Sequence, residues 1–562
     1  MKMMEHNGLD IALIQPPCWG NGTPPLGPAL LKSYLAKNGL KARVFDLNIL
    51  LCSLRHGPYA SAWDFKTGGN GLFTRWWSES FVRRMYAFYS HEVLNFMYSV
   101  LAAKPGTIGL SVQSHSFIAG RMLASKFKEI SPETQIVFGG PHVGRYMRQW
   151  RTLLSSGHAD AVVFGEGEES LAQYLKADRA GVIPGVARRE PGGEIADGGP
   201  RPPIPSLDDL PYADFSDFEL AAYAEKRVLP TYFSRGCINR CVFCVENQFF
   251  PGFRCRSGRR VFNDIAHQIS VHPEKKYFLM NESASNADVR ELEAFCDLVI
   301  DNGLKIGFSL GNAMVRKEMN AKFYSKLKRA GCTDIVYGLE SPSKRLLKSV
   351  GKTACLDVDI DRVISDGTRA KLTIGINMMF GLPGEQPEDN KQQLAFLRRH
   401  RRERKRLIIG GFNFCRFPQG CSVHKNPSEY GVDLSPGETY WSELDGSNTF
   451  IDRIAKFENF RAEGTRLGYR NFLSAGADAD RDEMLGHYHL HKGESKRALH
   501  YLRRSPVMEN MTLESVDRIM GLYAELSLEK DGYYNQLSRF KTEQAGDGHS
   551  DFENVRSRSD IA

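Results

Sequence analysis

The sequence has no apolar run that approaches the roughly 20 residues needed to span a bilayer. Its beginning, MKMMEHNGLDIALIQPP, lacks the layout of a signal peptide, because the apolar part is short and runs into Pro16 and Pro17. No sign of charge dominates: 74 basic and 66 acidic residues leave a net charge of +8. Eleven cysteines in such a chain indicate a reducing compartment rather than a disulfide framework. We therefore expect a cytoplasmic protein without a membrane span.

The composition, 42% hydrophobic and 25% charged, is typical of a globular protein. At 562 residues the chain exceeds one hydrophobic core, and about 150 residues per domain predicts three or four units. The dense basic run at Arg398–Arg406 could indicate nucleic-acid contact. It follows a helix-like stretch, Pro387–Leu397, and fits the basic last turn that a helix dipole favours. We therefore expect no nucleic-acid partner.

Residues 9–170 alternate short apolar runs with amphipathic segments. The predicted strands are Leu9–Ile14, Ala42–Leu47, Thr107–Val112, Gln135–Phe138 and Ala159–Phe164. Apolar strands joined by helices predict a Rossmann-like, doubly wound parallel sheet, which we place in a first domain at 1–176. The stretch 52–103 is an aromatic-rich insertion, predicted to be largely helical from Phe73. Residues 177–216 predict a hairpin followed by an extended, proline-rich linker.

A second β/α alternation begins at Val228. Its predicted strands are Val228–Phe233, Tyr277–Met280, Ile306–Leu310, Asp334–Tyr337, Thr373–Phe380 and Leu407–Phe414. Six units are too few for a closed eight-fold barrel and predict an open six-fold β/α partial barrel at 217–435, with its chemistry at the carboxyl ends of the strands. The fold class is therefore α/β, followed by a mainly helical region at 436–541 and a polar, disordered tail at 542–562.

Three cysteines stand just after the first barrel strand. Cys237, Cys241 and Cys244 form C-x3-C-x2-C, a spacing that random placement would give with a probability of about 0.004. A compact thiolate loop can hold an iron–sulfur cubane, and three protein ligands leave one of its four irons open. The alternative is a zinc site, which needs a fourth ligand, and Cys255 is the nearest candidate.

The segment CINRCVFC resembles the signature of the radical S-adenosylmethionine superfamily, including the aromatic residue Phe243. The resemblance implies that the three cysteines hold a [4Fe–4S] cluster whose fourth iron chelates S-adenosylmethionine. One electron then cleaves this cofactor to a 5′-deoxyadenosyl radical, and Phe243 lies against the adenine.

Other residues stand where the superfamily contacts S-adenosylmethionine. Asn281-Glu282-Ser283 follows the second strand and resembles the family's Gly-Gly-Glu position, which receives the methionine ammonium; the glycines are missing, but Glu282 keeps the charge. Gly338–Ser341 and Gly381–Glu385 end the fourth and fifth strands. The resemblance therefore implies cofactor contacts at Phe243, Asn281, Glu282, Ser283, Glu340, Ser341, Gly381 and Pro383.

Residues 9–170 resemble the cobalamin-binding domain that is fused to many members of this superfamily. The resemblance is carried by turns after the first, fourth and fifth strands, on the edge where open α/β sheets bind ligands. It implies cobalamin contacts at Pro25, Leu26, Gly27, Gly139, Gly140, His142, Gly165, Glu166 and Gly167. The alternative is a generic nucleotide-binding or structural domain.

The chain has no Asp-x-His-x-x-Gly motif, which supplies the lower cobalt ligand in many cobalamin domains. His115 and His142 follow strands but lack the partner aspartate. We therefore predict cobalamin with its base displaced and no histidine on cobalt. Cys415 and Cys421 end the sixth strand, and a role for them in the site stays open.

The resemblance implies an enzyme with three cofactors: the [4Fe–4S] cluster, S-adenosylmethionine and cobalamin. The expected reaction is methylation of an unactivated carbon, or phosphorus, of a small-molecule substrate, with an electron donor such as flavodoxin or ferredoxin. Two alternatives remain. One is a radical oxidoreductase or cyclase that uses cobalamin without methyl transfer, and the other is a non-catalytic corrinoid or iron–sulfur binding protein.

Overall fold

The structure is a computed structural model. It describes residues 8–60, 62–63, 75–177, 181–280, 282–469, 482, 485–486, 488–489, 492–502, 520 and 538. The chain divides into two compact units. The N-terminal unit holds residues 1–201 and 213–224 together with the described part of 475–562, and the barrel unit holds residues 202–212 and 225–474. The predicted linker is thus divided between the two units.

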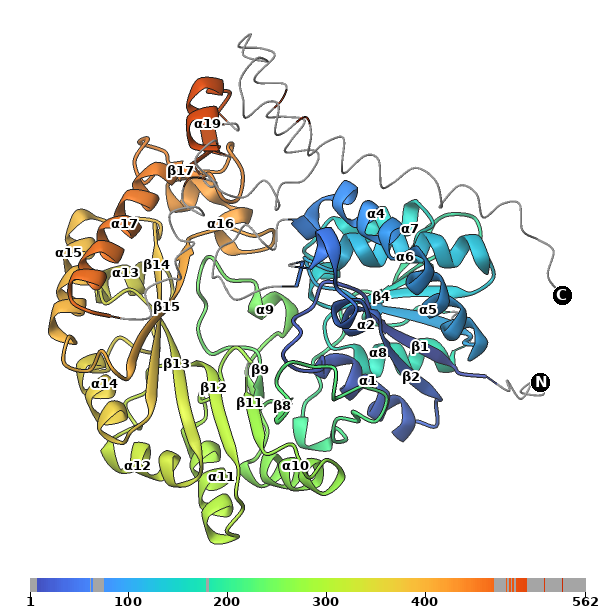
Figure 1. The fold of residues 1–562 in the computed structure, drawn as a ribbon, viewed down its shortest axis with the longest axis horizontal. Helices are drawn as coiled ribbons and strands as arrows, with labels where there is room; N and C mark the ends of the chain where they lie inside the picture. Colours follow the sequence, from blue (N-terminus) through green and yellow to red (C-terminus); the bar gives the residue numbers. More distant parts are fainter. Residues whose placement is uncertain are drawn as a thin grey trace. The chain divides into compact units, whose positions relative to one another are not determined.

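The N-terminal unit is built on a seven-stranded sheet with the order β2-β1-β3-β4-β5-β6-β7. Its parallel strands are β1 (Ile11–Gln15), β2 (Ala42–Asp46), β3 (Thr107–Ser111), β4 (Gln135–Gly139) and β5 (Ala161–Val163). Every residue of β1 is buried, as expected of a central strand covered on both faces. The predicted doubly wound parallel sheet is confirmed, and all five predicted strands are present (Figure 1).

The predicted hairpin is also present, but it belongs to this sheet. Strands β6 (Val186–Arg189) and β7 (Ile195–Asp197) pair antiparallel, and β6 pairs antiparallel with β5. The sheet is therefore mixed at one edge, because a two-stranded hairpin is only marginally stable unless it joins a larger sheet.

Most helices of this unit lie between the strands in sequence and pack around the sheet. They are α1 (Leu26–Lys37), α2 (Leu47–Ser53), α4 (Glu79–Phe88), α5 (Ser90–Ala102), α6 (Phe117–Ile130), α7 (Gln149–Ser155) and α8 (Gly167–Lys176), with short 3-10 turns η1 (Gly57–Tyr59), η2 (Arg75–Trp77) and η3 (Pro141–Val143). Helix α19 (Ser495–Leu502) follows all of the strands in sequence. α1 packs against α8, and α4 packs against α5 and α6. The insertion between β2 and β3 thus supplies η1, η2, α4 and α5.

The barrel unit contains a six-stranded sheet in the order β15-β14-β13-β12-β11-β8, with every pair parallel. The strands are β8 (Val228–Thr231), β11 (Tyr277–Met280), β12 (Gly307–Ala313), β13 (Cys332–Glu340), β14 (Thr373–Phe380) and β15 (Leu407–Phe414). Neighbours in sequence are neighbours in the sheet, and helices line its outer side (Figure 1). The predicted open six-fold partial barrel is confirmed.

The helices that follow the barrel strands begin at polar caps. They are α10 (Gly258–Val271), α11 (Val289–Asp301), α12 (Ala321–Arg329), α13 (Lys344–Ser349), α14 (Ile360–Arg369) and α15 (Pro387–Arg399). Asp288, Asn320 and Asp359 each accept hydrogen bonds from backbone N–H groups of the first turn that follows them. The basic run begins in the last turn of α15, where Arg398 pairs with Glu463 at 2.7 Å.

Shorter elements complete the barrel unit. They are η4 (Leu207–Asp209), β9 (Ser234–Arg235), α9 (Glu246–Phe249), β10 (Arg254–Cys255), α16 (Ser422–Lys425), η5 (Pro427–Tyr430), β16 (Val432–Asp433), β17 (Ser442–Glu443) and α17 (Phe450–Arg466). α17 packs on the sheet through edge-on aromatic contacts between Phe457 and both Phe380 and Phe414. The predicted tail at 542–562 lies outside the described residues.

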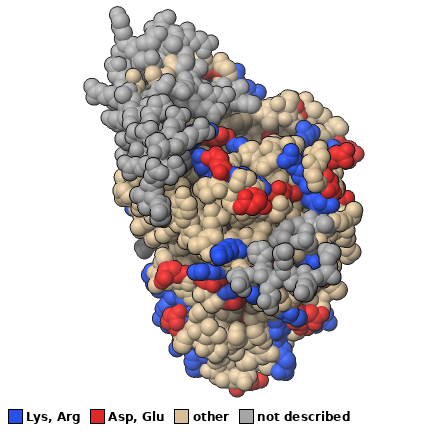
Figure 2. Space-filling view, turned by 90° about the vertical axis from the view of Figure 1, so that its right-hand side faces the viewer, with Lys and Arg blue, Asp and Glu red and all other residues tan. Residues whose placement is uncertain are grey.

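Two further findings concern the expected lack of a membrane span and the small net charge. Within the described part of the chain, no helix combines the length and apolar character that crossing a membrane requires. On the face shown in Figure 2, basic and acidic side chains are interspersed, in keeping with the small net charge.

Candidate active site

The three cysteines lie in one loop, which connects β9 to α9. Cys237 and Cys241 are partly buried, Cys244 is the most exposed, and all three are free thiols. The loop begins at Gly236, whose φ is 76°. A Cβ at this position would lie 1.9 Å from the carbonyl oxygen of Gly252, so only glycine allows the two backbone segments to approach so closely.

Backbone hydrogen bonds hold the loop from two sides. The N–H of Arg240 donates to the carbonyl of Gly351 at 3.3 Å, and that of Val242 donates to Val350 at 3.0 Å. On the other side, the N–H of Val423 donates to the carbonyl of Val242 at 3.2 Å. Segments that follow α13 and β15 thus fix the cysteine loop.

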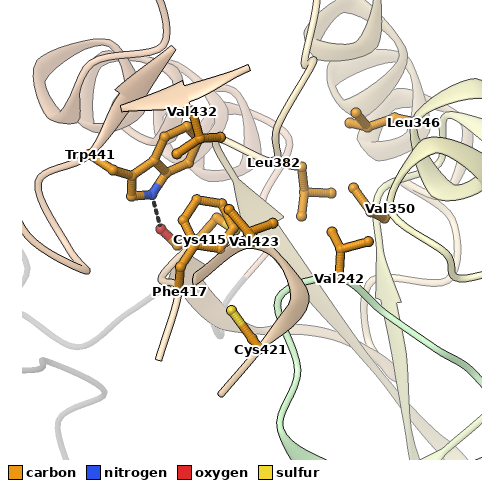
Figure 3. Packing of buried hydrophobic residues seen from close by; sticks show 10 residues of the cluster. All are labelled: Val242, Leu346, Val350, Leu382, Cys415, Phe417, Cys421, Val423, Val432 and Trp441. Atoms are coloured by element: carbon orange, nitrogen blue, oxygen red, sulfur yellow. Dashed lines mark hydrogen bonds between the residues drawn. The ribbon is translucent and has the colours of Figure 1, made fainter. Parts of the chain in front are cut away.

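The loop is also anchored in an apolar core. Val242 packs with Leu346, Val350, Leu382, Cys415, Phe417, Cys421, Val423, Val432 and Trp441 (Figure 3). Phe243 packs against this cluster and remains partly exposed, which leaves one part of the ring available to a ligand.

Cys415 and Cys421 both belong to this core. Each is no more than 1% exposed. Burial raises the pKa of both thiols, to about 11 for Cys421. A buried thiol of raised pKa is poorly reactive, so the structure places these two cysteines in packing roles.

The donor set of the loop is three thiols. This set suits a cubane, in which each thiolate binds a different iron. A structural zinc ion would need a fourth protein ligand. The alternative zinc ligand, Cys255, lies on β10 and donates to the carbonyl of Arg256.

Glu282, at the end of β11, has one oxygen in use and one without a partner. Oε1 accepts the backbone N–H of Phe233 at 2.5 Å, which ties Glu282 to the chain just before the cysteine loop. Oε2 is buried and has no hydrogen-bond partner among the described residues. Burial raises the pKa of Glu282 to about 7. An unpaired buried carboxylate oxygen fits a cationic or hydrogen-bond-donating ligand.

The neighbours of Glu282 are less informative. Asn281 lies outside the described residues. Ser283 is exposed, and its hydroxyl interacts with the carboxylate of Glu246 in α9.

Glu340 and Ser341 stand at the end of β13. The pairing register with β14 shifts between Gly338 and Glu340, and Glu340 has a φ of 66°. Such a bulge redirects a side chain. The carboxylate of Glu340 accepts from the ammonium of Lys352 at 2.9 Å. Ser341 is fully buried, and its hydroxyl accepts the N–H of Ser343.

The turn after β14 is shaped by α17. Gly381 has a φ of 77°, and a Cβ there would lie 1.9 Å from Cδ of Arg453. Its N–H donates to Glu385 at 2.7 Å, and Glu385 pairs with Lys456 at 3.1 Å. The space that a side chain at position 381 would take is filled by a buried arginine from α17. Pro383 is buried in the same turn.

In the N-terminal unit, the predicted cobalamin contacts lie at the carboxyl ends of β1, β4 and β5. These residues are Pro25, Leu26, Gly27, Gly139, Gly140, His142, Gly165, Glu166 and Gly167. A Cβ on Gly27 would meet nothing within 4 Å, whereas one on Gly140 would lie 2.5 Å from the carbonyl of Val112. No side chain caps the start of α1 or α8 within the described residues. The edge therefore offers helix N-termini and open space to a ligand.

Two aromatic residues cover the histidines on this edge. His142 lies 4.7 Å from Phe117, and the ring of His115 stacks on Trp77 at 5.7 Å. Burial, with a smaller effect of His115, lowers the pKa of His142 to about 4. No sequence motif selects Trp77, which lies in the long insertion between β2 and β3. The aromatic content of that insertion was the available signal.

Comparison with known proteins agrees with this geometry. Residues 231–397 match the Radical SAM superfamily, so the predicted resemblance is confirmed. The chain is 25% identical over 303 residues to an uncharacterized methyltransferase of Pyrococcus horikoshii, covering 52% of this chain and 64% of that protein. It is 24% identical over 268 residues to an anaerobic magnesium-protoporphyrin IX monomethyl ester cyclase of Rubrivivax gelatinosus, covering 46% and 48%. The chain thus spans about half to two thirds of these relatives.

Two solved structures share the fold. One is the radical S-adenosylmethionine methyltransferase TsrM from Kitasatospora setae, with a TM-score of 0.56 and 16% identity over 75% of this chain and 78% of that one. The other is the cobalamin-dependent S-adenosylmethionine radical enzyme OxsB, with a TM-score of 0.54 and 16% identity over 96% and 79%. At this sequence identity, the similarity to the two structures shows a shared fold and no more.

Proposed function

From the premise that residues 231–397 form a radical SAM domain, we propose that the chain is a cobalamin-dependent radical S-adenosylmethionine methyltransferase. Its substrate is a small molecule that is methylated at an unactivated carbon or at phosphorus. The observation that carries the proposal is the anchored loop of three free thiols, together with a buried oxygen of Glu282 that has no hydrogen-bond partner among the residues that the structure describes.

In this proposal Cys237, Cys241 and Cys244 bind the [4Fe–4S] cluster and leave one iron open. The bound cluster and S-adenosylmethionine together supply the radical chemistry. Glu282 accepts from the methionine amino group through Oε2, because an ionised acceptor strengthens such a hydrogen bond. Phe243 covers the adenine with its exposed part.

Further contacts to S-adenosylmethionine come from the ends of three strands. Ser283 follows β11, Ser341 follows β13 beside Glu340, and the backbone of Gly381 and Pro383 follows β14. Asn281 keeps its predicted role beside Glu282. Those of these residues that the structure describes stand at the carboxyl edge of the barrel sheet, where β/α barrels hold their ligands.

The N-terminal unit is proposed to bind cobalamin at its carboxyl edge. The open position at Gly27 admits the cofactor, and the uncapped N-termini of α1 and α8 offer N–H groups to its polar side chains. The similarity to OxsB, whose structure holds cobalamin, extends over 96% of this chain and supports this assignment.

A cyclase or oxidoreductase that uses the same cofactors without methyl transfer is the second candidate. The observation in its favour is the relative from Rubrivivax gelatinosus, a cyclase. Either activity needs a one-electron donor, for which flavodoxin or ferredoxin is proposed. Eleven cysteines and a cluster with an open iron favour the reducing cytoplasm.

Anaerobic reconstitution with iron, sulfide and cobalamin tests the proposal. The wild-type chain should bind one cluster and cleave S-adenosylmethionine to 5′-deoxyadenosine or S-adenosylhomocysteine. The triple Cys237→Ala, Cys241→Ala, Cys244→Ala variant should do neither, and Cys255→Ala is the matched control that should do both. Cluster assembly in the triple variant would overturn the site. Mass spectrometry of assays with candidate extracts distinguishes a methylated product from a cyclised one.

A further inference from the structure

Lys352 stands beside the cysteine loop in a position that the backbone fixes. It follows Val350 and Gly351, whose carbonyls accept hydrogen bonds from the loop at Val242 and Arg240. Gly351 has a φ of 74°, and a Cβ on it would lie 2.5 Å from the carbonyl oxygen of Arg240. The close contact at Gly351 therefore sets the distance between Lys352 and the cysteines.

The side chain of Lys352 is held by Glu340. The ammonium lies 2.9 Å from the carboxylate, and the two side chains are only 13% and 12% exposed. A Cβ on Gly338 would lie 3.2 Å from the ammonium and 3.0 Å from the carboxylate oxygen, so the pair packs closely over this glycine. The bulge at the end of β13 and the positive φ of Glu340 direct the carboxylate toward the lysine. A backbone held in this region usually marks a functional constraint.

Lys352 stands next to Cys241. A Cβ on Gly351, the residue before Lys352, would lie 3.7 Å from Cα of Cys241. Arg240 and Val242, which flank Cys241, are the residues whose N–H groups donate to the carbonyls of Gly351 and Val350. The lysine is therefore held beside the loop that carries the three cysteines.

We propose that Lys352, held in place by Glu340, raises the reduction potential of the cluster that Cys237, Cys241 and Cys244 bind. The proposal rests on the proposed function. An external one-electron donor transfers one electron to the oxidised cluster, and no proton or bond is exchanged at Lys352. The added negative charge is stabilised by an ammonium that is shielded from water, where screening is weak. Charge and solvent exposure around the sulfurs are what set such potentials.

The residue is a positioning residue, and the test therefore measures potential rather than turnover. Full-length wild type, Lys352→Met and Glu340→Gln are reconstituted anaerobically. Lys348→Met is the matched control, because Lys348 is an exposed lysine on the neighbouring helix α13. Iron and sulfide content establish cluster assembly, and redox titration followed by electron paramagnetic resonance gives the midpoint potential. Calorimetry gives the affinity for S-adenosylmethionine.

Opposite shifts are expected from the two partners. In Lys352→Met the ratio of reduced to oxidised cluster at a fixed potential should fall about tenfold, which is 59 mV for a one-electron couple. Glu340→Gln removes a negative charge and should shift the ratio upward, and Lys348→Met should match the wild type. If Lys352→Met does not retain a cluster, Lys352→Gln decides the question: a potential below that of the wild type supports the proposal, and an unchanged or higher potential overturns it.

Three other results separate the failure of this inference from the failure of the proposed function. Wild-type potential in a cluster-loaded Lys352→Met variant overturns the role of Lys352 while the cluster assignment stands. Weaker S-adenosylmethionine binding with an unchanged potential has the same consequence and assigns the lysine to the cofactor instead. A wild-type chain that assembles no cluster contradicts the proposed function itself.

Discussion

The carboxyl edges of the two sheets are built differently. The barrel edge carries three thiols, Glu282 with an unpartnered oxygen, and the Lys352–Glu340 ion pair. The edge of the N-terminal sheet carries mainly glycines, helix starts without side-chain caps and aromatic rings that pack against histidines. A site that binds a metal cluster needs specific ligand atoms, whereas a site for a large cofactor needs space and backbone groups. The cluster site is therefore defined by particular residues, and the cofactor site by the shape of the sheet edge.

The largest expected effects come from one substitution at each edge, and each substitution should affect only the cofactor of its own edge. Cys241→Ser should abolish the [4Fe–4S] absorbance, because a hydroxyl is a poor ligand in a cluster that has only three protein ligands. Gly140→Ala should leave cluster content unchanged and reduce cobalamin retention, since its Cβ would lie 2.5 Å from the carbonyl of Val112 and distort the edge. Iron, sulfide and cobalt analysis of the reconstituted proteins measures both.

A variant at one edge that emptied both sites would contradict this independence. Ser283→Ala serves as a control at the barrel edge, because Ser283 is exposed and is not a cluster ligand in the proposal. It should retain both the cluster and cobalamin.

The next largest effect concerns Glu282. Glu282→Gln keeps the shape of the side chain and removes the charge, so binding of S-adenosylmethionine should weaken by about 1.5–3 kcal/mol, the range for hydrogen bonds to charged groups. Calorimetry on cluster-loaded protein measures the difference. Equal affinity in the two proteins would remove Glu282 from the cofactor site and leave it the role of holding Phe233.

The pH dependence of this difference is a sharper test. Burial raises the pKa of Glu282 to about 7, so the free site is increasingly protonated below that pH. A ligand that needs the ionised carboxylate can then bind only after Glu282 has lost its proton. The affinity for this ligand therefore falls by up to tenfold per pH unit below about pH 7. The advantage of wild type over Glu282→Gln should therefore shrink between about pH 8 and about pH 6. A difference that did not change with pH would argue against ionised Glu282 as the acceptor.

Two glycine substitutions, one at each edge, should change local stability in opposite directions. Gly381→Ala combines a positive φ with a contact of 1.9 Å to Arg453, and it should destabilise the turn after β14 by about 1–3 kcal/mol. Gly27→Ala meets open space inside α1 and should stabilise that helix by about 0.5–1 kcal/mol, while its methyl group intrudes on the proposed cobalamin site. Hydrogen exchange at the amides of each segment measures both effects. Unchanged exchange after β14 would mean that Arg453 moves aside readily.

Much of the fold could be predicted because its signals are local. The strands Tyr277–Met280, Thr373–Phe380 and Leu407–Phe414 were predicted with the bounds that the structure shows, since apolar runs between turn residues define them. The cysteine loop was evident from spacing alone. The pairing of the hairpin with β5 was missed, because strand partners are chosen by tertiary contacts that a sequence pattern does not contain.

The remaining site residues depend on contacts between distant segments. Lys352 reaches the cysteine loop across more than a hundred residues, and Arg453 reaches Gly381 from a helix that carries no motif. A lysine or an arginine in a charged helical stretch is most often a solvated surface residue, so nothing in the sequence selected these two. The cofactor contact at Gly381 stays a prediction, and the structure adds that this glycine leaves room for the side chain of Arg453.

The smallest expected effect is that of replacing His115 or His142, because we predict that neither histidine binds cobalt. His142 packs against Phe117 at 4.7 Å, and burial lowers its pKa to about 4, while His115 is stacked on Trp77. A metal-binding imidazole is normally oriented by a carboxylate or carbonyl on its second nitrogen, and the sequence lacks the aspartate that would supply it. Electron paramagnetic resonance of the Co(II) form should therefore show no nitrogen splitting from the protein, and His115→Ala and His142→Ala should leave the spectrum unchanged. A splitting that disappears in either variant would identify the ligand and contradict the prediction. Failure of the wild type to bind any corrinoid would show instead that the glycine-lined edge has a structural role, because the barrel edge can hold its cluster without it.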